Sequence, residues 1–140
     1  MGITILTDQQ STGSMEPFQI VANLRCAGTC TRGYGVSLDS SGYITNSATA
    51  TLWAVVGIAM KTGAAGDTIP VLVKGWCDFG VSDGNIAATD YYVYVVDGGT
   101  LNGATLAEAA GTNNTLLAQA VGKCPVAADS GTTISFWVSP

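Results

Sequence analysis

The stretch VGIAMKTGAAGDTIPVLV at residues 56–73 recurs 65 positions later as VGKCPVAADSGTTISFWV at residues 121–138, without a gap. The opening Val-Gly aligns with Val-Gly, Gly66 aligns with Gly131, and the Thr-Ile that follows each glycine aligns as well. Apolar residues then alternate in both copies, which is the period-two pattern of a half-buried strand. The stretch predicts two copies of one β-unit, with chance similarity among valine- and glycine-rich strands as the alternative.

A second, weaker match lies upstream of the first. YGVSLDSSGYI at residues 34–44 resembles YVYVVDGGTL at residues 92–101 when a gap of one residue is allowed. Both segments have the composition of a hairpin, so the units extend over about 34–75 and 91–138. Units of this size are too small to bury their apolar faces alone. We therefore predict one all-β domain over residues 33–140, a small sandwich or barrel of two similar β-units.

Short runs of β-branched and aromatic residues alternate with turn clusters along the whole of this region. In such turns glycine supplies the positive φ angle and aspartate bonds to its own backbone. The sequence predicts strands at 35–38, 52–60, 69–74, 91–96, 118–124 and 133–138, and turns at 39–42, 63–66 and 97–99.

One segment has helical features, and the prediction allows at most one or two short helices. Thr105 and Glu108 have the spacing of a capping box, and Gly111 is placed to end a short helix. The segment coincides with the extra residues of the second unit. A polar loop is the alternative.

Residues 1–32 lie outside the repeat, are mostly polar and contain Pro17 and Phe18. Such a segment is typical of an extended N-terminal arm that becomes ordered on a partner. Pro17 and Phe18 are candidate interface residues of that arm. A start of the chain without a role is the alternative.

The charge of the chain excludes several classes of partner. It has 5 basic and 10 acidic side chains, no histidine and a net charge of −5. Nucleic-acid binding needs a basic footprint, and anionic membranes attract basic segments, so we expect neither partner. The N-terminus has no signal-peptide pattern and no apolar run is long enough to span a membrane.

The low content of charged residues, 11% of the chain, is as informative as their sign. Ordinary soluble proteins have roughly 25%. One interpretation is a protein that works while packed against neighbours; the other is a β-protein with an uncharged polar surface.

Four cysteines have no zinc-site spacing. Cys26 and Cys30 stand close together in CAGTC, while Cys77 and Cys124 are isolated in apolar strand-like segments. Paired ligands at two places are typical of structural zinc, so metal binding is the least favoured state. Free thiols and a single Cys26–Cys30 disulfide both remain open.

No catalytic motif is present in the sequence. The absence of histidine removes the commonest general base, and no phosphate-binding loop or S-x-x-K nucleophile occurs. Asp78, Asp83, Asp90 and Asp97 lack the spacing of a calcium loop and have turn-forming neighbours. We therefore expect no enzyme activity, no cofactor and no metal.

Three tryptophans, Trp53, Trp76 and Trp137, have alternative roles. In its strand, Trp137 alternates with the apolar residues Ile134, Phe136 and Val138, so it points away from their face. An outward tryptophan indicates an interface, and three of them are also typical of a sugar-stacking platform. Core packing on the other face of the sheet is the third possibility.

The segments VVGIAMKTGAAGDTIPVLVKG, ATDYYVYVVDGGTL and AQAVGKCPVAADSGTTISFWVSP together resemble the small head decoration, or cement, proteins of tailed bacteriophages. The resemblance covers roughly residues 33–140, and the cysteines depart from the family pattern. It implies no catalytic residues and assigns structural turns to the glycines that carry the match: Gly57, Gly66, Gly75, Gly122 and Gly131.

The resemblance implies a structural virion protein that binds the outside of an icosahedral capsid and stabilises it by bridging capsid subunits. Its expected partners are the major capsid protein and two further copies of itself, since a capsid offers three equal sites around each three-fold position. It would be made in the host cytoplasm and reside on the capsid exterior. The alternative function is a carbohydrate-binding or adhesin β-module.

Overall fold

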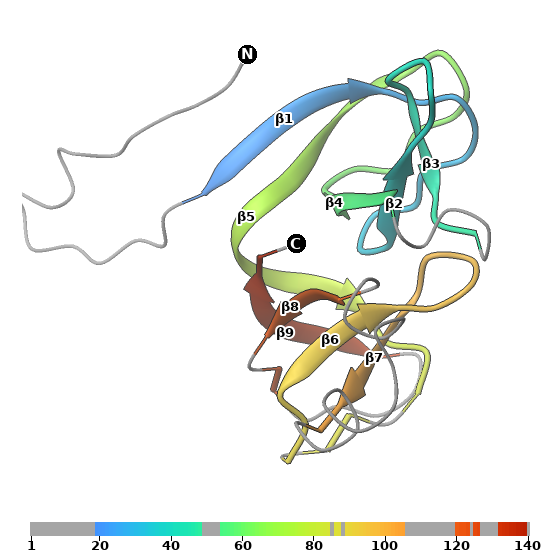
Figure 1. Ribbon diagram of the computed structural model, residues 1–140. Coiled ribbons are helices and arrows are strands. Elements are labelled where there is room, and N and C mark those ends of the chain that lie inside the picture. Colours follow the sequence, from blue (N-terminus) through green and yellow to red (C-terminus); the bar gives the residue numbers. More distant parts are fainter. Residues whose placement is uncertain are drawn as a thin grey trace, which may run out of the picture.

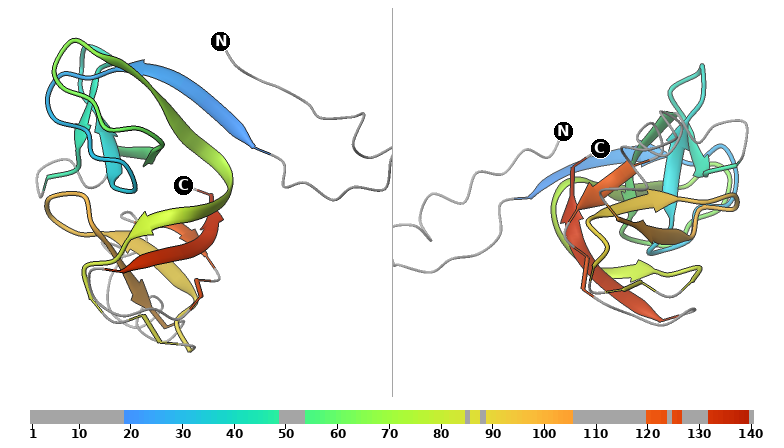
Figure 2. Two further views of the ribbon diagram at one scale, coloured as in Figure 1. Left: turned by 180° about the vertical axis from the view of Figure 1, so that it is seen from behind. Right: turned by 60° about the horizontal axis from the view of Figure 1, so that its bottom comes forward.

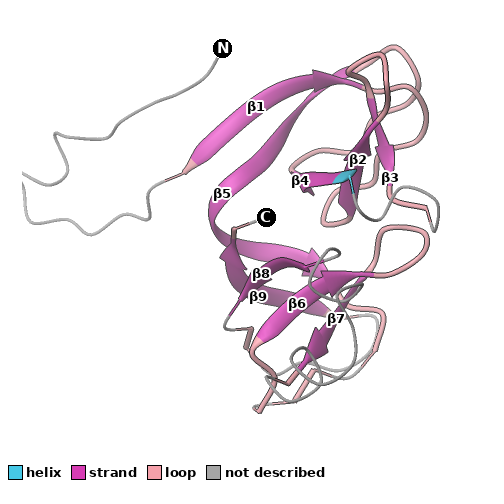
Figure 3. Ribbon diagram, in the orientation of Figure 1, coloured by secondary structure: helices cyan, strands magenta, loops and turns pink. Residues whose placement is uncertain are grey.

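The computed structural model describes residues 19–48, 54–84, 86–87, 89–105, 120–123, 125–126 and 132–139. Strands and turns make up nearly all of this part of the chain, as Figure 3 shows, which confirms the predicted all-β fold. The nine strands are β1 (Ile20–Arg25), β2 (Gly35–Leu38), β3 (Ile44–Asn46), β4 (Val55–Ala59), β5 (Thr68–Val81), β6 (Tyr92–Val95), β7 (Leu101–Ala104), β8 (Ala120–Lys123) and β9 (Thr133–Val138).

The strand order shows the internal repeat directly. Neighbouring strands follow the order β3-β2-β4-β5-β9-β8-β6-β7, and β1 pairs with β5. Within each half, a hairpin pairs with the third strand, and the third strand pairs with the closing strand. The two halves thus have the same antiparallel connectivity and lie one above the other in Figure 1.

The long strand β5 belongs to both halves. Its first part pairs with β4 and β1, and its second part pairs with β9. Gly75 stands between the two parts with a φ of 129°, in the region that favours glycine. Figures 1 and 2 show β5 curving from one half into the other at this point.

Strand β1 is the counterpart of the second part of β5. β1 pairs with the first part of β5, which is the closing strand of the first half. In the same way, the second part of β5 pairs with β9, the closing strand of the second half. Just beyond these strands, the amide of Ala27 donates to the Ile44 carbonyl and that of Asp83 donates to the Leu101 carbonyl, both at 2.7 Å. Each half therefore contains five strands.

Residues 20–32 accordingly belong to the folded body, which differs from the expected arm over residues 1–32. β1 pairs along its whole length with β5, and Cys26 and Cys30 are buried in the core of the first half. The sequence comparison missed β1 because its residues share almost no identity with the second part of β5. Pro17, Phe18 and most of the predicted short helix from Thr105 to Gly111 lie outside the described residues.

The two hairpins correspond without the gap that the sequence comparison needed. The Asp39 amide donates to the Tyr43 carbonyl at 2.8 Å, and in the other hairpin the Val96 amide donates to the Thr100 carbonyl at 2.9 Å. This spacing of 57 residues aligns Tyr34 with Tyr91, not with Tyr92. A β-bulge also recurs at the same place, after Val36 in one half and after Val93 in the other.

Each half curls until its last strand meets its first. Cys26, just after β1, forms a parallel bridge to Ile44 of β3, and Ser82, just after β5, forms one to Leu101 of β7. Both halves are therefore small, nearly closed five-stranded barrels, which limits the exposed strand edges on which other chains could add strands.

The apolar side chains form two clusters and not one common core. The smaller cluster lies inside the first barrel and includes Val36, Ile44 and Val71. The larger one fills the second barrel and extends across the junction to Ile58 and Leu72 of the first half. Ile58 and Leu72 are fully buried, so this contact joins the two barrels.

Three of the five predicted turn glycines, Gly57, Gly75 and Gly122, lie inside strands instead. A Cβ on Gly57 would collide with the carbonyl oxygen of Leu72, and one on Gly122 with that of Trp137. These contacts are equivalent in the repeat, so the same close approach of two backbones requires glycine twice. Gly66 does lie in a turn, with a φ of 93°, and Gly131 falls outside the described residues.

Replacing Gly57 or Gly122 by alanine is expected to lower the free energy of unfolding by about 1–3 kcal/mol, the usual cost of overpacking. The obstructing atom is a backbone oxygen that moves only if the strand pairing moves. Urea unfolding measures the change. Gly84→Ala is the matched control, because its methyl group meets the mobile side-chain amide of Asn102 at 3.1 Å. An equal loss in the control would contradict the explanation.

Candidate functional site

The outer face of the second barrel has an aromatic row. In β9, Ile134, Phe136 and Val138 are buried, whereas Trp137 between them is half-buried and faces outward. Trp137 is paired in register with Trp76 of β5. Trp137 therefore points outward in the structure, as its position in the sequence alternation predicts.

The row continues across two further strands. On its other side Trp137 is paired with Lys123 of β8, and Lys123 with Tyr92 of β6. Paired residues in neighbouring strands have their side chains close together on one face. We call Trp76, Trp137, Lys123 and Tyr92 the aromatic row.

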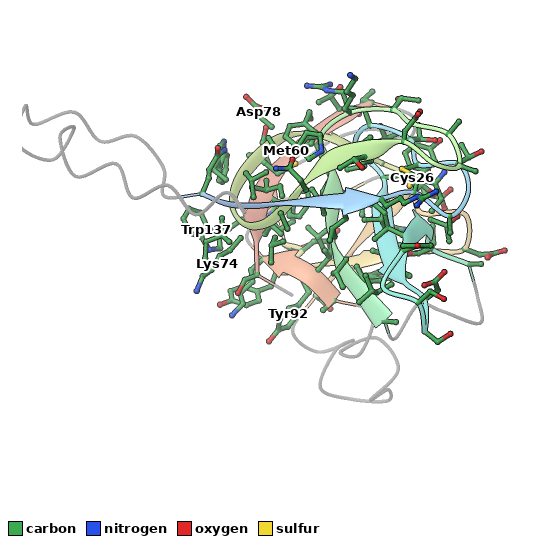
Figure 4. The ribbon with its side chains drawn as sticks, turned by 90° about the horizontal axis from the view of Figure 1, so that it is seen from above. Cys26, Met60, Lys74, Asp78, Tyr92 and Trp137 are labelled. Atoms are coloured by element: carbon green, nitrogen blue, oxygen red, sulfur yellow. The ribbon has the colours of Figure 1, made fainter. Side chains whose placement is uncertain are left out.

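Charged and aromatic neighbours extend this surface. Tyr91 is exposed and packs edge-on against Tyr92, with ring centroids 4.9 Å apart. Lys74 and Asp78 flank Trp76 along β5 and are both exposed. Figure 4 shows Lys74 and Trp137 at the same end of the molecule, opposite Cys26. Two of the five basic residues of the chain, Lys74 and Lys123, thus border the tryptophans.

The chain enters the fold beside this row. The side-chain amide of Gln19 donates to the carbonyl oxygen of Trp76 at 3.4 Å, one residue before β1 begins. Residues 1–18 therefore connect to the body next to the tryptophans.

The three described cysteines are free and buried. Burial, followed by the interaction with Cys26, raises the pKa of the Cys30 thiol to about 12. Burial raises the pKa of the Cys77 thiol to about 11. Thiols that hold their protons so strongly are poor nucleophiles and poor metal ligands at neutral pH. They act here as small core residues; Cys124 lies outside the described residues.

Several acidic side chains of the described chain accept hydrogen bonds within turns. The Asp39 carboxylate accepts the amides of Ser41 and Tyr43, and the Asp90 carboxylate accepts that of Ala87. Within the described ranges no three cysteine or acidic side chains are grouped as metal ligands would be. No helix in this part of the chain is long and apolar enough to cross a bilayer.

Sequence reasoning found only part of this surface. It singled out Trp137 but did not place Trp76 opposite it, because the second part of β5 was not predicted as a strand. It also assigned Lys74 and Lys123 to no surface. Their alternation with buried neighbours was the available signal. Trp53, the third tryptophan, lies outside the described residues.

A solved structure has a similar architecture. The fold is similar to the crystal structure of the head fiber gp8.5 N base of bacteriophage phi29, with a TM-score of 0.60 and 13% sequence identity. The similarity covers 87% of this chain and 95% of that chain. No family model matches the sequence. No curated protein matches it in sequence. At this identity the likeness shows the fold.

The raised thiol pKa predicts a pH dependence of stability. Above the ordinary value of 9.0, an unfolded Cys77 loses its proton while the folded one keeps it up to about 11. The unfolding free energy should therefore fall as pH rises through this range, by up to about 1.4 kcal/mol per pH unit from this thiol. Cys77→Ala should show a shallower fall in urea unfolding.

Val93→Ala is the matched control for this measurement. It truncates a buried side chain of the same barrel without removing an ionisable group. It should lower the stability at every pH and keep the steeper fall of the unmodified chain. Parallel curves for Cys77→Ala and the unmodified chain would show that Cys77 does not contribute.

Proposed function

We propose that this chain is a structural virion protein of a tailed bacteriophage that binds the outer surface of the icosahedral head. The observation that carries the proposal is the fold similarity to a phage head-fiber base over nearly the whole of both chains. The low charge and the outward aromatic row support it, because both suit a protein that works against neighbouring subunits. The resemblance of residues 33–140 to head decoration proteins points the same way.

The proposed action is stabilisation of the assembled shell, as expected of a decoration or cement protein. A protein that binds only assembled capsid shifts the equilibrium away from disassembly. Three linked copies around a three-fold position would bind much more tightly than one, so each contact with the major capsid protein can be modest. The protein would then reside on the capsid exterior after synthesis in the host cytoplasm.

Residues 1–18 are the proposed bridge to a neighbouring capsid subunit. They precede β1, which enters the fold beside Trp76. An extended segment can cover a large surface and add backbone hydrogen bonds to a strand edge. Pro17 and Phe18 would supply apolar contacts at the base of this segment.

The second candidate function is carbohydrate binding, which the outward Trp76 and Trp137 favour. Flat aromatic faces stack on sugar rings, and the pair is exposed enough to be reached. A glycan array followed by tryptophan-fluorescence titration distinguishes the candidates. Saturable binding of a defined glycan, with no binding to phage heads, would replace the capsid proposal by this one.

Phage heads that carry the protein should withstand more heat and a stronger osmotic shock than heads stripped of it. The expected difference comes from linkage, since rupture must also release the bound copies. Release of DNA, followed by a dye that binds nucleic acid, measures the rupture. Adding the purified protein back should restore the resistance, and identical rupture of both kinds of head would disprove the stabilising role.

Deleting residues 1–18 should leave the β-fold intact and weaken binding to stripped heads by at least about tenfold, which corresponds to 1.4 kcal/mol. Co-sedimentation with heads measures binding, and circular dichroism with urea unfolding checks the fold. A chain whose first 18 residues are replaced by a Gly-Ser sequence of equal length is the matched control for simple tethering. If the deletion binds as tightly as the full chain, the bridge lies elsewhere.

A further inference from the structure

The exposed apolar side chains of the described chain fall into two groups. Leu38 and Tyr43 lie in the hairpin of the first barrel, and are 36% and 38% exposed. Tyr91 and Val126, 37% and 55% exposed, lie in the second barrel. Tyr91 packs on the aromatic row, and the Val126 amide donates to Ser135 of β9, next to Trp137. Each barrel thus has one apolar patch.

The contact between the two barrels shows what such patches can do. The β6–β7 hairpin of the second barrel docks on the first barrel, with the Gly35 amide donating to the Gly99 carbonyl at 2.7 Å and the Gly98 amide donating to the Ser47 carbonyl at 2.8 Å. Val95 of this hairpin is fully buried and lies against Gly35. The hairpin is seen reaching toward the first barrel in Figure 1.

The apolar patch of the first barrel, Leu38 and Tyr43, belongs to the β2–β3 hairpin. In the repeat this hairpin is equivalent to the docking β6–β7 hairpin. Leu38 corresponds to Val95, and Val73 corresponds to Val138. Val95, which lies against Gly35, and Val138, on the inner face of β9, are fully buried, whereas Leu38 is exposed and Val73 is half-buried. The β2–β3 hairpin points away from the second barrel in Figure 1, and its residues Leu38, Asp39 and Tyr43 are exposed.

The aromatic row corresponds to the face of the first barrel that is buried at the junction. Ile58 and Leu72 on that face are fully buried and belong to the cluster that also contains Val95 of the hairpin. Their equivalents are Lys123 and Trp137 of the aromatic row, of which one is exposed and the other half-buried. Within the described residues, counterparts of both sides of the internal contact therefore occur a second time, at the β2–β3 hairpin and at the aromatic row.

We propose that these two surfaces bind each other between copies: the β2–β3 hairpin of one chain, with Leu38 and Tyr43, docks on the aromatic row of the next chain. Both surfaces carry both signs of charge: Asp39 and Arg25, whose guanidinium lies 5.2 Å from the centroid of the Tyr43 ring, at the hairpin, and Lys123, Lys74 and Asp78 at the row. In the proposed contact Asp39 would face the two lysines. The inference rests on the trimer of the proposed function and names its interface.

The contact between copies differs from the internal one in geometry. Tyr92 stands in the row where Gly35 stands in the first barrel, and a Cβ at Gly35 would already meet Val95 at 2.5 Å. Leu38 therefore meets the row farther out than Val95 meets the first barrel. A head-to-tail contact forms a ring or an open filament according to its rotation. The outward displacement of Leu38 changes the angle by which one copy is rotated relative to the next. A closed ring of three copies requires one particular rotation angle.

The test uses two variants that each disable one surface. Leu38→Lys places a charge on the hairpin, opposite the lysines of the row, and Trp137→Thr removes the centre of the row while keeping a strand-forming residue. Each is expected to weaken self-association of the full chain by at least about tenfold in analytical ultracentrifugation. An equimolar mixture should form a one-to-one pair, because the intact hairpin of one variant meets the intact row of the other.

Asn23→Lys is the matched control, since it adds the same charge at an exposed strand position outside both patches. It should associate like the unmodified chain. Circular dichroism and urea unfolding establish that each variant is folded. An unmodified chain that stays monomeric, variants that associate normally, or a mixture without pairs would each overturn the proposal. A symmetric row-to-row contact would leave Leu38→Lys unaffected and so is excluded by the expected result.

Binding to stripped phage heads separates this inference from the proposed function. If the unmodified chain binds heads but the Leu38→Lys and Trp137→Thr variants self-associate normally, the interface is wrong and the capsid role stands. If the variants behave as expected and no chain binds heads, the interface stands and the capsid role is wrong.

Discussion

The structure depends on β5 pairing with different strands along its two parts. Residues 68–74 close the first barrel, and residues 75–81 open the second, with Gly75 providing the change of direction in its left-handed backbone conformation. The shared strand links the barrels covalently, and backbone hydrogen bonds of the β6–β7 hairpin to Gly35 and Ser47 add to this link. The buried side chains at the junction, Ile58 and Leu72, then fix the barrels against each other.

The two halves share the features that their strand pairing requires, and they differ at positions on the outer faces of the barrels. Gly57 and Gly122 hold the same close backbone approach, and the bulges after Val36 and Val93 recur at equivalent positions. On the outer face, in contrast, apolar Leu72 is matched by a half-exposed tryptophan. The inner positions of the repeat therefore specify the barrel, whereas the outer positions determine how far the outer face of each barrel is buried within the described chain.

Much of this could be predicted from the sequence, because period-two alternation and glycine-rich turns are local signals. The closing strands β5 and β9, the hairpin strands β2 and β6, and the turn at Asp39 were predicted in this way. β1 and the second part of β5 were missed, since mixed residues such as Asn23, Arg25 and Asp78 interrupt their alternation. The aromatic row was missed with them: a row across four strands depends on pairing partners far apart in sequence, which no local pattern contains.

A chain with two nearly equivalent barrels has a consequence for assembly that neither barrel would have alone. Within the chain, the β6–β7 hairpin docks on the first barrel. The equivalent hairpin, β2–β3, and the equivalent face, the aromatic row, are separate surfaces of the described chain. Had the outer residues been identical in both halves, a second contact would match the internal one in geometry, and its rotation alone would decide between a closed ring and an open filament. Tyr92 and Lys123 stand in the aromatic row where Gly35 and Ile58 stand in the first barrel, so the two equivalent faces differ in shape and charge. The divergence of outer positions thus leaves partly exposed, in the second barrel, a face whose equivalent in the first barrel is buried.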